Sequence, residues 1–340
     1  MNHLILNNFP DAEIKRNWEH FLAISDFAAD YTSWQFFEDP LVLENRKFAV
    51  LAIDSNKQVH GSLTGVFSGK RLVSGLPNRP QIALDRTGGR LQAVSALSDG
   101  LLELAKDNCS FIEVHSFYPI KEFEQLGFKS SSNELGDIVV LDLELPIDEI
   151  FKGFSQTRRN EIRKAEKVGA LEISELQTEG ELCELYKIHK SWCLKKGITA
   201  DAFENFSSFL IRKNERKVFV AKLDGKVIAG SYYRFYAGGV IEYAGNNSIP
   251  EFQKYRPNDL IGWHSIQWAK SAGFKLYSMG GAHLFLRRFG GETVRSTRYT
   301  KDISLFGINT KKEAIQNYGI RLYQSIPLSI RKRGAFLRGK

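Results

Sequence analysis

Residues 218–281 read VFVAKLDGKVIAGSYYRFYAGGVIEYAGNNSIPEFQKYRPNDLIGWHSIQWAKSAGFKLYSMGG, and the order of patterns in this stretch decides the fold. Apolar residues alternate from Val218 to Leu223 and again from Val227 to Phe235, on either side of Asp224-Gly225. A period of two indicates strands, and Asp-Gly between two strands is typical of a tight hairpin turn because Gly accepts a positive φ. The stretch therefore begins with an antiparallel hairpin.

The rest of the stretch predicts a strand, a polar loop, a helix and a further strand. The third strand spans Val240 to Ala244, and the loop after it leads to a helix capped by Asn258 or Asp259. Gly273 ends this helix, and Phe274 to Met279 forms the fourth strand. Hairpin, strand, loop, capped helix and strand together describe the core of a compact α/β unit.

The same unit occurs twice along the 340 residues. Lys47–Phe67 matches Lys217–Phe235 in its alternation, its turn aspartate and a following Gly-Ser, at an offset of about 170 residues. A helix over Leu91–Lys106 and a strand over Phe111–Val114 then follow in the order of the later unit. The last strand of each unit is expected at Ile138–Leu143 and at Asp302–Phe306.

The duplication predicts two domains of mixed α/β (α+β) architecture. A repeat of this length indicates duplicated domains and not a solenoid. We place the boundary near Pro146, so that residues 1–146 form the first repeat and residues 147–310 the second, with residues 311–340 joined to the first. Two helical segments should precede the first hairpin. Each repeat should hold a mixed, mostly antiparallel sheet flanked by helices.

The net charge of +8 is concentrated near the C-terminus. From Thr310 to Lys340, eight basic residues stand against one acid. This segment is either a solvated tail or a patch for anionic lipid headgroups, phosphorylated substrate or RNA. No signal-peptide pattern opens the chain and no apolar run is long enough for a membrane span. We therefore expect a cytoplasmic protein whose basic segment touches the inner membrane face.

The three cysteines do not indicate a metal site. Cys109, Cys183 and Cys193 form no CxxC pair, and their spacing to the nearest histidine does not suit a tetrahedral ligand set. Reduced thiols in a cytosolic protein account for them. We therefore expect no metal.

A basic helix connects the two repeats. Residues 156–169 read QTRRNEIRKAEKVG, with Ile162 facing inward and Gly169 as the helix stop. Arg159 and Arg163 lie one turn apart and can clamp a phosphate, since the guanidinium donates bidentately. A solvated basic face is the alternative reading.

These motifs resemble the Fem-type branch of the GNAT superfamily, the peptidoglycan interpeptide-bridge aminoacyltransferases and their shorter relatives. The resemblance lies in residues 158–169, in residues 243–281 and in the Arg288-Phe289-Gly290 segment, and it covers most of the chain. It implies tandem GNAT-type acyltransferase domains, with acyl transfer in the second repeat and the acceptor between the repeats. It also implies that the C-terminal segment folds back as a helix onto the first repeat. The long coiled-coil arm of larger members is missing.

Four residues are candidates for catalysis. Glu242 is either the acceptor of the amine proton or a solvated strand carboxylate, and Tyr243 either orients the carbonyl or packs in the core. His283 follows Gly280-Gly281 on a loop, and Arg288 stands where the family more often has Lys. Tyr299 and Asp302 are further candidates near the cleft. Candidates for substrate contact are Trp34, Gln35, Arg159, Arg163, Lys254, Arg256, Asn258, Gly280, Gly281 and Phe289.

The loop before the helix of the second repeat bears on the donor. The CoA-using branch cradles pyrophosphate with a glycine-rich loop, whereas residues 253–259 read QKYRPND, which contains no glycine. Pro257 also removes one backbone N–H. We therefore expect an aminoacyl-tRNA donor, with Lys254, Arg256 and the basic tail as phosphate contacts, and no bound cofactor. Acyl-CoA is the alternative donor.

The sequence therefore predicts an acyltransferase that forms an amide on an amine of a cell-envelope precursor, in peptidoglycan or a surface polysaccharide. Two alternatives stay open. The first is an acyl-CoA-dependent N-acyltransferase acting on an amino sugar or a lipid-linked amine. The second is a non-catalytic protein that binds envelope precursors or RNA.

Overall fold

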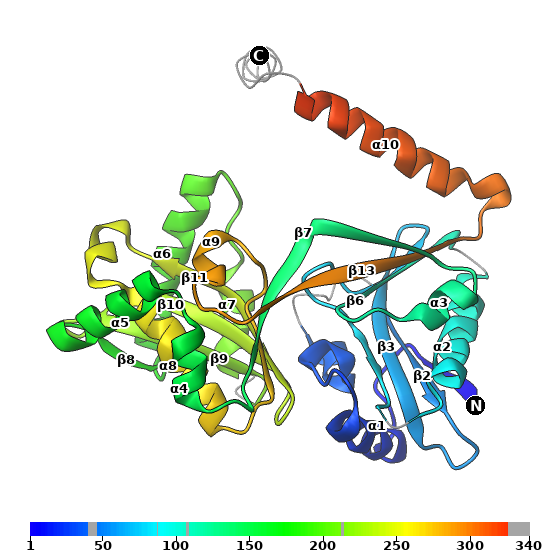
Figure 1. The fold of residues 1–340 in the computed structure, drawn as a ribbon, viewed down its shortest axis with the longest axis horizontal. Helices are drawn as coiled ribbons and strands as arrows, with labels where there is room; N and C mark the ends of the chain where they lie inside the picture. Colours follow the sequence, from blue (N-terminus) through cyan, green and yellow to red (C-terminus); the bar gives the residue numbers. More distant parts are fainter. Residues whose placement is uncertain (40–45, 87, 107–108, 212–213, 326–340) are drawn as a thin grey trace.

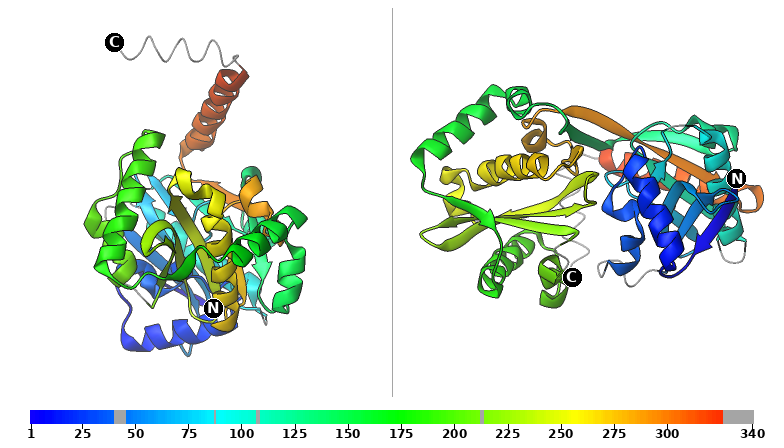
Figure 2. Two further views of the ribbon diagram at one scale, coloured as in Figure 1. Left: turned by 90° about the vertical axis from the view of Figure 1, so that its left-hand side faces the viewer. Right: turned by 90° about the horizontal axis from the view of Figure 1, so that it is seen from below.

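The computed structural model describes residues 1–39, 46–86, 88–106, 109–211 and 214–325 (Figure 1). In this part of the chain the strands form one 13-stranded sheet in the order β1-β2-β3-β4-β6-β13-β7-β12-β11-β10-β9-β8, with β5 paired to β3. Figure 2 shows helices on both faces of the sheet in each repeat. None of the helices described here is long and apolar enough to cross a bilayer.

The first repeat runs from the N-terminus to the long strand β7. Its elements are β1 (Asn2–Leu6), α1 (Ala12–Ile24), the 3₁₀ helices η1 (Asp30–Thr32) and η2 (Trp34–Glu38), β2 (Lys47–Ile53), β3 (Val59–Ser68), β4 (Arg71–Ser74), β5 (Ile82–Leu84), α2 (Arg90–Ala105), β6 (Phe111–Ser116), α3 (Lys121–Gln125) and β7 (Lys129–Asp142). The hairpin, the helix and the following strand that the sequence predicts are present as β2–β3, α2 and β6.

The second repeat repeats this order. Its elements are α4 (Ile147–Gly153), α5 (Gln156–Val168), β8 (Glu172–Glu175), α6 (Glu179–Lys196), α7 (Phe203–Ile211), β9 (Arg216–Leu223), β10 (Lys226–Phe235), β11 (Val240–Ser248), the 3₁₀ helix η4 (Pro250–Tyr255), α8 (Pro257–Ser271), β12 (Leu276–Ser278), α9 (Leu284–Arg287) and β13 (Glu292–Asp302), followed by the 3₁₀ helix η5 (Leu305–Gly307) and α10 (Ile308–Ser325).

The predicted hairpin of the second repeat has the expected turn. β9 and β10 pair antiparallel, and the pairing reaches Lys226 opposite Leu223. The two residues between them, Asp224 and Gly225, have φ values of 49° and 77°. Two positive φ angles match the right-handed twist of the flanking strands, which is why Asp-Gly is favoured at this position.

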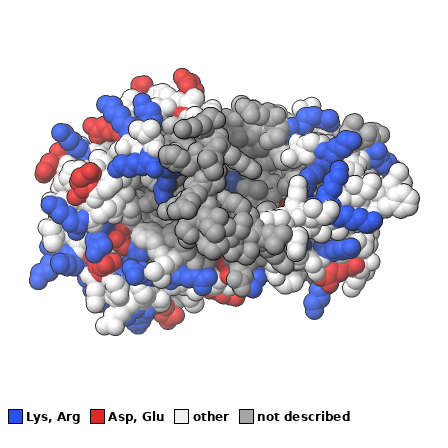
Figure 3. Space-filling model, turned by 90° about the horizontal axis from the view of Figure 1, so that it is seen from above, with Lys and Arg blue, Asp and Glu red and all other residues white. Residues whose placement is uncertain are grey.

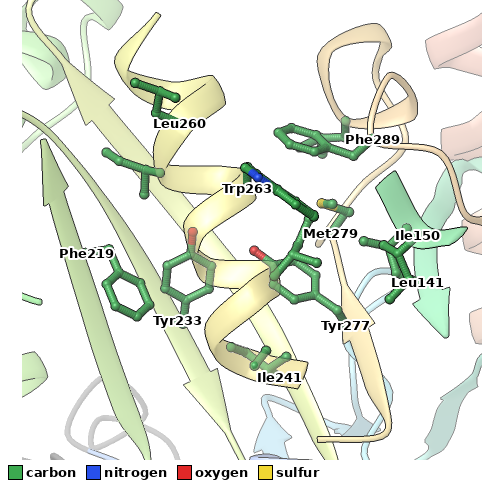
Figure 4. Packing of buried hydrophobic residues seen from close by; sticks show 14 of the residues in the cluster. Leu141, Ile150, Phe219, Tyr233, Ile241, Leu260, Trp263, Tyr277, Met279 and Phe289 are labelled. Carbon is green, nitrogen blue, oxygen red and sulfur yellow. The ribbon is translucent and has the colours of Figure 1, made fainter. Parts of the chain in front are cut away.

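Alternate residues of the central strands face different helices. Phe219 and Ala221 pack with α8 in one core cluster, whereas Val218 and Val220 pack with α6 and α7 in another. Figure 4 shows Phe219 and Tyr233 beside α8. The first repeat follows the same rule, with α2 on one face and α1 on the other. Strand residues alternate between faces, so each repeat is a helix–sheet–helix sandwich.

The two repeats exchange their last strands. β7 of the first repeat pairs antiparallel with β12 of the second, and β13 of the second repeat pairs antiparallel with β6 of the first. β7 and β13 also pair with each other along both halves of their length. Figure 1 shows the two strands running from one repeat into the other. The boundary at residue 146 stays a prediction, because β7 before it pairs with the second repeat and β13 after it pairs with the first.

A buried ion cluster also joins the repeats. Arg216 of β9 donates to the carboxylates of Asp30 at 2.7 Å and Asp39 at 3.0 Å, and each of the three side chains is almost fully buried. Tyr31 donates a short hydrogen bond to Asp39. Burial lowers the pKa of Arg216, but Asp30 and Asp39 more than offset this effect and the pKa lies above its ordinary value. Arg216 therefore keeps its positive charge at the repeat interface.

Several local expectations are wrong. The final strand expected at Asp302–Phe306 is instead β13, which ends at Asp302; the carboxylate of Asp302 then accepts hydrogen bonds from Ser304 and Thr310 at the start of α10. The chain opens with strand β1, which was not expected, and the expected helical segments follow it as α1 and the 3₁₀ helices η1 and η2. Arg256, with φ 59°, precedes α8 as its N-cap, and neither Asn258 nor Asp259 caps this helix.

The first two turns of α10 fold back onto the first repeat. Glu313 pairs with Arg298 at 2.6 Å, and Asn309 donates to Ser110. Beyond these contacts the helix projects away from the body, with Ile315 and Tyr318 exposed (Figure 1). The basic residues after 325 lie outside the described part of the chain. On the face seen from above, Lys and Arg side chains spread over both repeats (Figure 3).

Candidate active site

The strands β11 and β12 separate at Glu242. They pair in parallel at Val240–Leu276, Ile241–Tyr277 and Glu242–Ser278, and no further pair follows. On its other side, β11 has a bulge, because Tyr232 pairs with Gly245 while Tyr233 pairs with Tyr243. Ala244 therefore has no partner in either register. A bulge beside diverging strands leaves backbone groups available to a substrate, and bulges are frequent next to active sites.

A cavity of about 130 Å³ lies at this point. Its wall contains residues from both repeats. The second repeat contributes Arg234, Glu242, Tyr243, Ala244, Met279, Gly280, His283 and Leu286, and the first repeat contributes Asn78 and Arg79. The Asn78 amide donates to the backbone oxygen of Gly280 at 3.1 Å, which holds the loop of the first repeat against the second. We call this space the inter-repeat cavity.

Glu242 is the central ionisable group of the inter-repeat cavity. It is 3% exposed, and its Oε2 has no hydrogen-bond partner in the described structure. Burial raises the pKa of Glu242, and this effect outweighs the opposing fields of Arg234 and Arg79. A carboxylate with a raised pKa takes up a proton more readily near neutral pH, which suits a general base.

Two arginines and a tyrosine stand beside Glu242. Arg234 lies opposite Glu242 in the β10–β11 register. The guanidinium carbons of Arg79 and Arg234 each lie 5.1 Å from the ring centroid of Tyr31. Burial and the charge of Arg234 lower the pKa of Arg79, and burial raises the pKa of Tyr31 to about 12. The wall of the cavity therefore contains both basic and acidic side chains.

A second cavity of about 250 Å³ continues from the first. The two share Arg79, Arg234 and Ala244 in their walls. The larger one extends along α6 and α7, where His189, Trp192, Asn205, Phe206 and Asn247 face it. We call it the α6–α7 cavity. The two cavities therefore adjoin each other, with Glu242 in the wall of the smaller one.

Gly280 sets the shape of the inter-repeat cavity. Its φ is 66°, and a Cβ built there would lie 2.5 Å from the backbone oxygen of Tyr243. The neighbouring Gly281 differs, since a Cβ there would only touch Leu286 at 3.5 Å. The close approach of the two backbones thus depends on the missing side chain of Gly280.

Replacing Gly280 with Ala should reduce amide formation at least about tenfold, because the added Cβ must push Tyr243 away from the cavity. The Gly281→Ala variant is the matched control and should keep the wild-type rate within about twofold. Rates are compared after circular dichroism shows that both variants are folded. Equal rates for both variants would contradict this account of the cavity.

A third and larger cavity lies away from these two. It has a volume of about 600 Å³ and shares no wall residue with them. Lys164, Lys254 and Arg256 contribute cationic groups to its wall, and Ala165, Val168, Leu171 and Tyr255 contribute apolar surface. We call it the α5 cavity, because α5 and the residues before α8 enclose it.

The N-terminus of α8 is occupied by a buried ion pair. Arg158 of α5 is 1% exposed and contacts the carboxylate of Asp259 in the first turn of α8. Its guanidinium also donates to the backbone oxygen of Phe285 at 2.8 Å, and it lies 4.3 Å from the ring centroids of Phe285 and Phe289. Burial is the main cause that lowers the pKa of Arg158, to about 10.

The structure brings some of the predicted site residues together. Glu242, Tyr243, His283 and Gly280 line the inter-repeat cavity, and burial raises the pKa of the Tyr243 phenol. Gly281 follows Gly280 in the chain. Lys254 and Arg256 line the α5 cavity, where Arg256 also pairs with Glu161 at 3.0 Å.

Other predicted residues hold the protein together and do not line these cavities. The phosphate clamp stays a prediction: Arg159 donates to the backbone oxygens of Lys152 and Phe154, and Arg163 lies over the ring of Phe151. The remaining residues take structural positions. The side chains of Trp34, Gln35 and Asn258 donate to Glu19, Glu215 and Ser248, respectively. Phe289 is buried beside Gly262, the backbone oxygen of Arg288 accepts from Ser155, and Tyr299 accepts from the backbone of Ile120.

Sequence reasoning missed Asn78, Arg79, Arg234 and Arg158. Arg234 had a detectable signal, because a charged residue inside the apolar run of a central strand is rare unless it is paired or functional. Arg158 directly precedes Arg159 and lies four residues before Ile162, so it shares the buried face of α5. Asn78 and Arg79 lie in a turn after β4 whose sequence has no distinctive pattern, so only the fold reveals them.

Comparisons with known proteins agree with this geometry. Residues 152–289 match the family model described as "Acetyltransferase (GNAT) domain". FemX has a similar structure, with TM-score 0.71 and 14% identity over 88% of this chain and 97% of that one. A C-terminal domain described for a lysylphosphatidylglycerol synthetase of Agrobacterium fabrum aligns with TM-score 0.60 and 12% identity, over 90% of this chain and 97% of that one.

A third similar structure is a tandem GNAT protein from the clavulanic acid biosynthesis pathway, with TM-score 0.54 and 10% identity over 89% of this chain and 99% of that one. A search of curated proteins found no match. The fold is therefore that of tandem GNAT proteins, and the resemblance to the Fem-type branch is confirmed at the level of the fold. The family match and these neighbours support an acyltransferase.

Proposed function

We propose that the protein transfers an aminoacyl group to an amine of a cell-envelope component, with the reaction taking place in the inter-repeat cavity. The observation that carries this proposal is Glu242, a buried carboxylate whose Oε2 has no hydrogen-bond partner among the described residues, at the point where β11 and β12 separate. The resemblance to Fem-type enzymes supports an envelope acceptor, as does the similarity to a domain described for a lysylphosphatidylglycerol synthetase.

In the proposed reaction the neutral amine nitrogen attacks the carbonyl carbon of the donor ester. Glu242 takes one proton from the amine as the C–N bond forms, and the C–O bond to the ribose breaks. The proton then passes to the leaving ribose oxygen, which restores the carboxylate. The backbone N–H of Ala244, left without a strand partner by the bulge, is the group we assign to the developing oxyanion.

The α8 N-terminus supports a donor other than acyl-CoA. A pyrophosphate cradle needs several free N–H groups and no negative charge near them. Here Pro257 lacks an N–H, and the Asp259 carboxylate already occupies the first turn as the partner of Arg158. A pyrophosphate at this point would meet a buried carboxylate.

The α5 cavity suits a single-stranded part of a charged tRNA away from its aminoacylated end. Lys164, Lys254 and Arg256 offer contacts to backbone phosphates, and the half-buried ring of Tyr255 offers a surface on which a base can stack. This combination of cations and an aromatic ring is typical of single-stranded nucleic-acid sites. We therefore assign the donor to aminoacyl-tRNA.

A label-transfer assay tests the donor. Pooled, radiolabelled aminoacyl-tRNA or labelled acetyl-CoA is mixed with the protein and an extract of envelope precursors, with and without prior RNase treatment. Amide product that disappears after RNase treatment is expected. The Lys254→Glu variant should raise the KM for charged tRNA about tenfold, whereas Lys226→Glu, at the exposed β9–β10 turn, should not. Product from acetyl-CoA that resists RNase would refute the tRNA assignment.

A further inference from the structure

The inter-repeat cavity contains more positive charge than acyl transfer requires. Arg79 and Arg234 reach it from different repeats, and neither forms an ion pair with an acid among the residues that the structure describes. The Arg234 Nη1 atom lies 3.3 Å from the Tyr31 hydroxyl, and its Nε has no partner although the residue is only 5% exposed. Buried guanidinium groups are normally paired, so the buried Arg234 lacks a counterpart, and the half-buried Arg79 adds a second positive charge beside it.

The same small space also contains an unsatisfied acceptor. Glu242 Oε2 has no partner and forms no ion pair with either arginine in the described structure. Leaving a buried donor and a buried acceptor unsatisfied side by side is costly, and a bound molecule with complementary groups would satisfy both. The complement of this wall is an ammonium or amine beside a carboxylate.

The volume fits such a group. A water molecule takes up about 30 Å³ in the liquid, and the inter-repeat cavity holds about 130 Å³. It therefore accepts a fragment of a few heavy atoms, the size of an amino-acid head group. The rest of a larger molecule can extend into the adjoining α6–α7 cavity, where Trp192 and Asn205 lie.

We propose that the acceptor amine sits on a carbon that also carries a carboxylate, with Arg79 and Arg234 binding the carboxylate and Glu242 facing the amine. This inference rests on the proposed transfer function and names its acceptor class as an amino-acid head group. The planar forks of two guanidinium groups match a carboxylate, and the two repeats together position it against the diverging strands.

Three matched acceptors test this. The three differ at the carbon that bears the free amine. Mono-N-acetyl-diaminopimelate carries a carboxylate on this carbon, and the corresponding carboxamide carries an uncharged group of the same size. Nα-acetyl-lysine carries only hydrogen on it. With the donor found in the label-transfer assay, kcat/KM for the carboxylate acceptor should exceed the other two about 10- to 100-fold, the range of a charge-assisted hydrogen-bond pair. Arg79→Lys and Arg234→Lys should each bring this preference close to one. Arg16→Lys, on the exposed face of α1, should preserve it.

Isothermal calorimetry with the same three compounds separates the two proposals. Selective binding of the carboxylate compound without any transfer would refute the proposed function and leave this inference standing. Equal kcat/KM or equal binding for all three acceptors would overturn the inference, as would a preference that survives both arginine substitutions. Arg79 follows β4, and Arg234 lies on β10. Melting temperatures identify any variant that loses its fold.

Discussion

Glu242→Gln should lower the rate of amide formation about 10²- to 10⁴-fold, the usual contribution of a general base. The amide side chain keeps the size and shape of the carboxylate, but an NH2 donor replaces one acceptor oxygen and the group cannot take up the amine proton. The KM for the acceptor should change much less than kcat. The Glu251→Gln variant, on the exposed surface of η4, is the matched control and should retain the wild-type rate.

The same variant should change how stability depends on pH. Because burial raises the pKa of Glu242 above its ordinary value of 4.5, the unfolded chain releases this proton before the folded protein does. The stability that Glu242 contributes is then complete below about pH 4.5 and falls as the pH rises through the folded-state pKa. The melting temperature of Glu242→Gln should therefore gain on the wild type as pH increases. A constant difference between the two would contradict the raised pKa.

Arg216→Met should destabilise the protein by about 3–5 kcal/mol, the cost of leaving a buried ion-pair partner uncompensated. Arg216 is almost fully buried and donates to the carboxylates of Asp30 and Asp39 in the first repeat. Its removal takes away the positive charge that faces these two carboxylates at the interface. Urea unfolding measured by tryptophan fluorescence gives the free energy. Arg16→Met on the surface of α1 should change it by less than about 0.5 kcal/mol.

A combined variant tests the cause of this loss. Adding Asp30→Asn and Asp39→Asn to Arg216→Met removes the uncompensated charges, and this should restore part of the lost stability. No recovery in the triple variant would mean that packing around Arg216, and not charge, holds the repeats together. Tyr31, which donates to Asp39, also contacts Arg79 and Arg234 in the wall of the inter-repeat cavity. The triple variant should therefore also lose activity.

Local patterns predicted the repeated units well, and the reason is physical. The alternation around Asp224-Gly225 and the helix that ends at Gly273 depend on residues close together in the chain. The exchange of β7 and β13 between the repeats depends on pairing between distant segments, which no local pattern encodes. The expected strand at Asp302–Phe306 failed for a related reason, since Asp302 is needed at the start of α10.

The candidate site divides in the same way. Glu242 and Gly280 lie on elements of the second repeat that the pattern located, so their positions followed from the strand order. Arg79 reaches the cavity from a turn about 160 residues earlier, and only the joined sheet brings it there. Arg159 was singled out for its spacing of four residues from Arg163, whereas the buried arginine is Arg158, four residues before Ile162.

Photo-crosslinking of an acceptor tests the central claim that transfer takes place between the repeats. An amino-acid acceptor with a diazirine next to its amine is irradiated with the protein, and mass spectrometry maps the labelled peptides. We predict labels on residues 75–81 of the first repeat and on residues 240–248 of the second, reduced by excess unlabelled acceptor. Labels confined to the α5 cavity, around residues 254–256, would contradict this placement of the site.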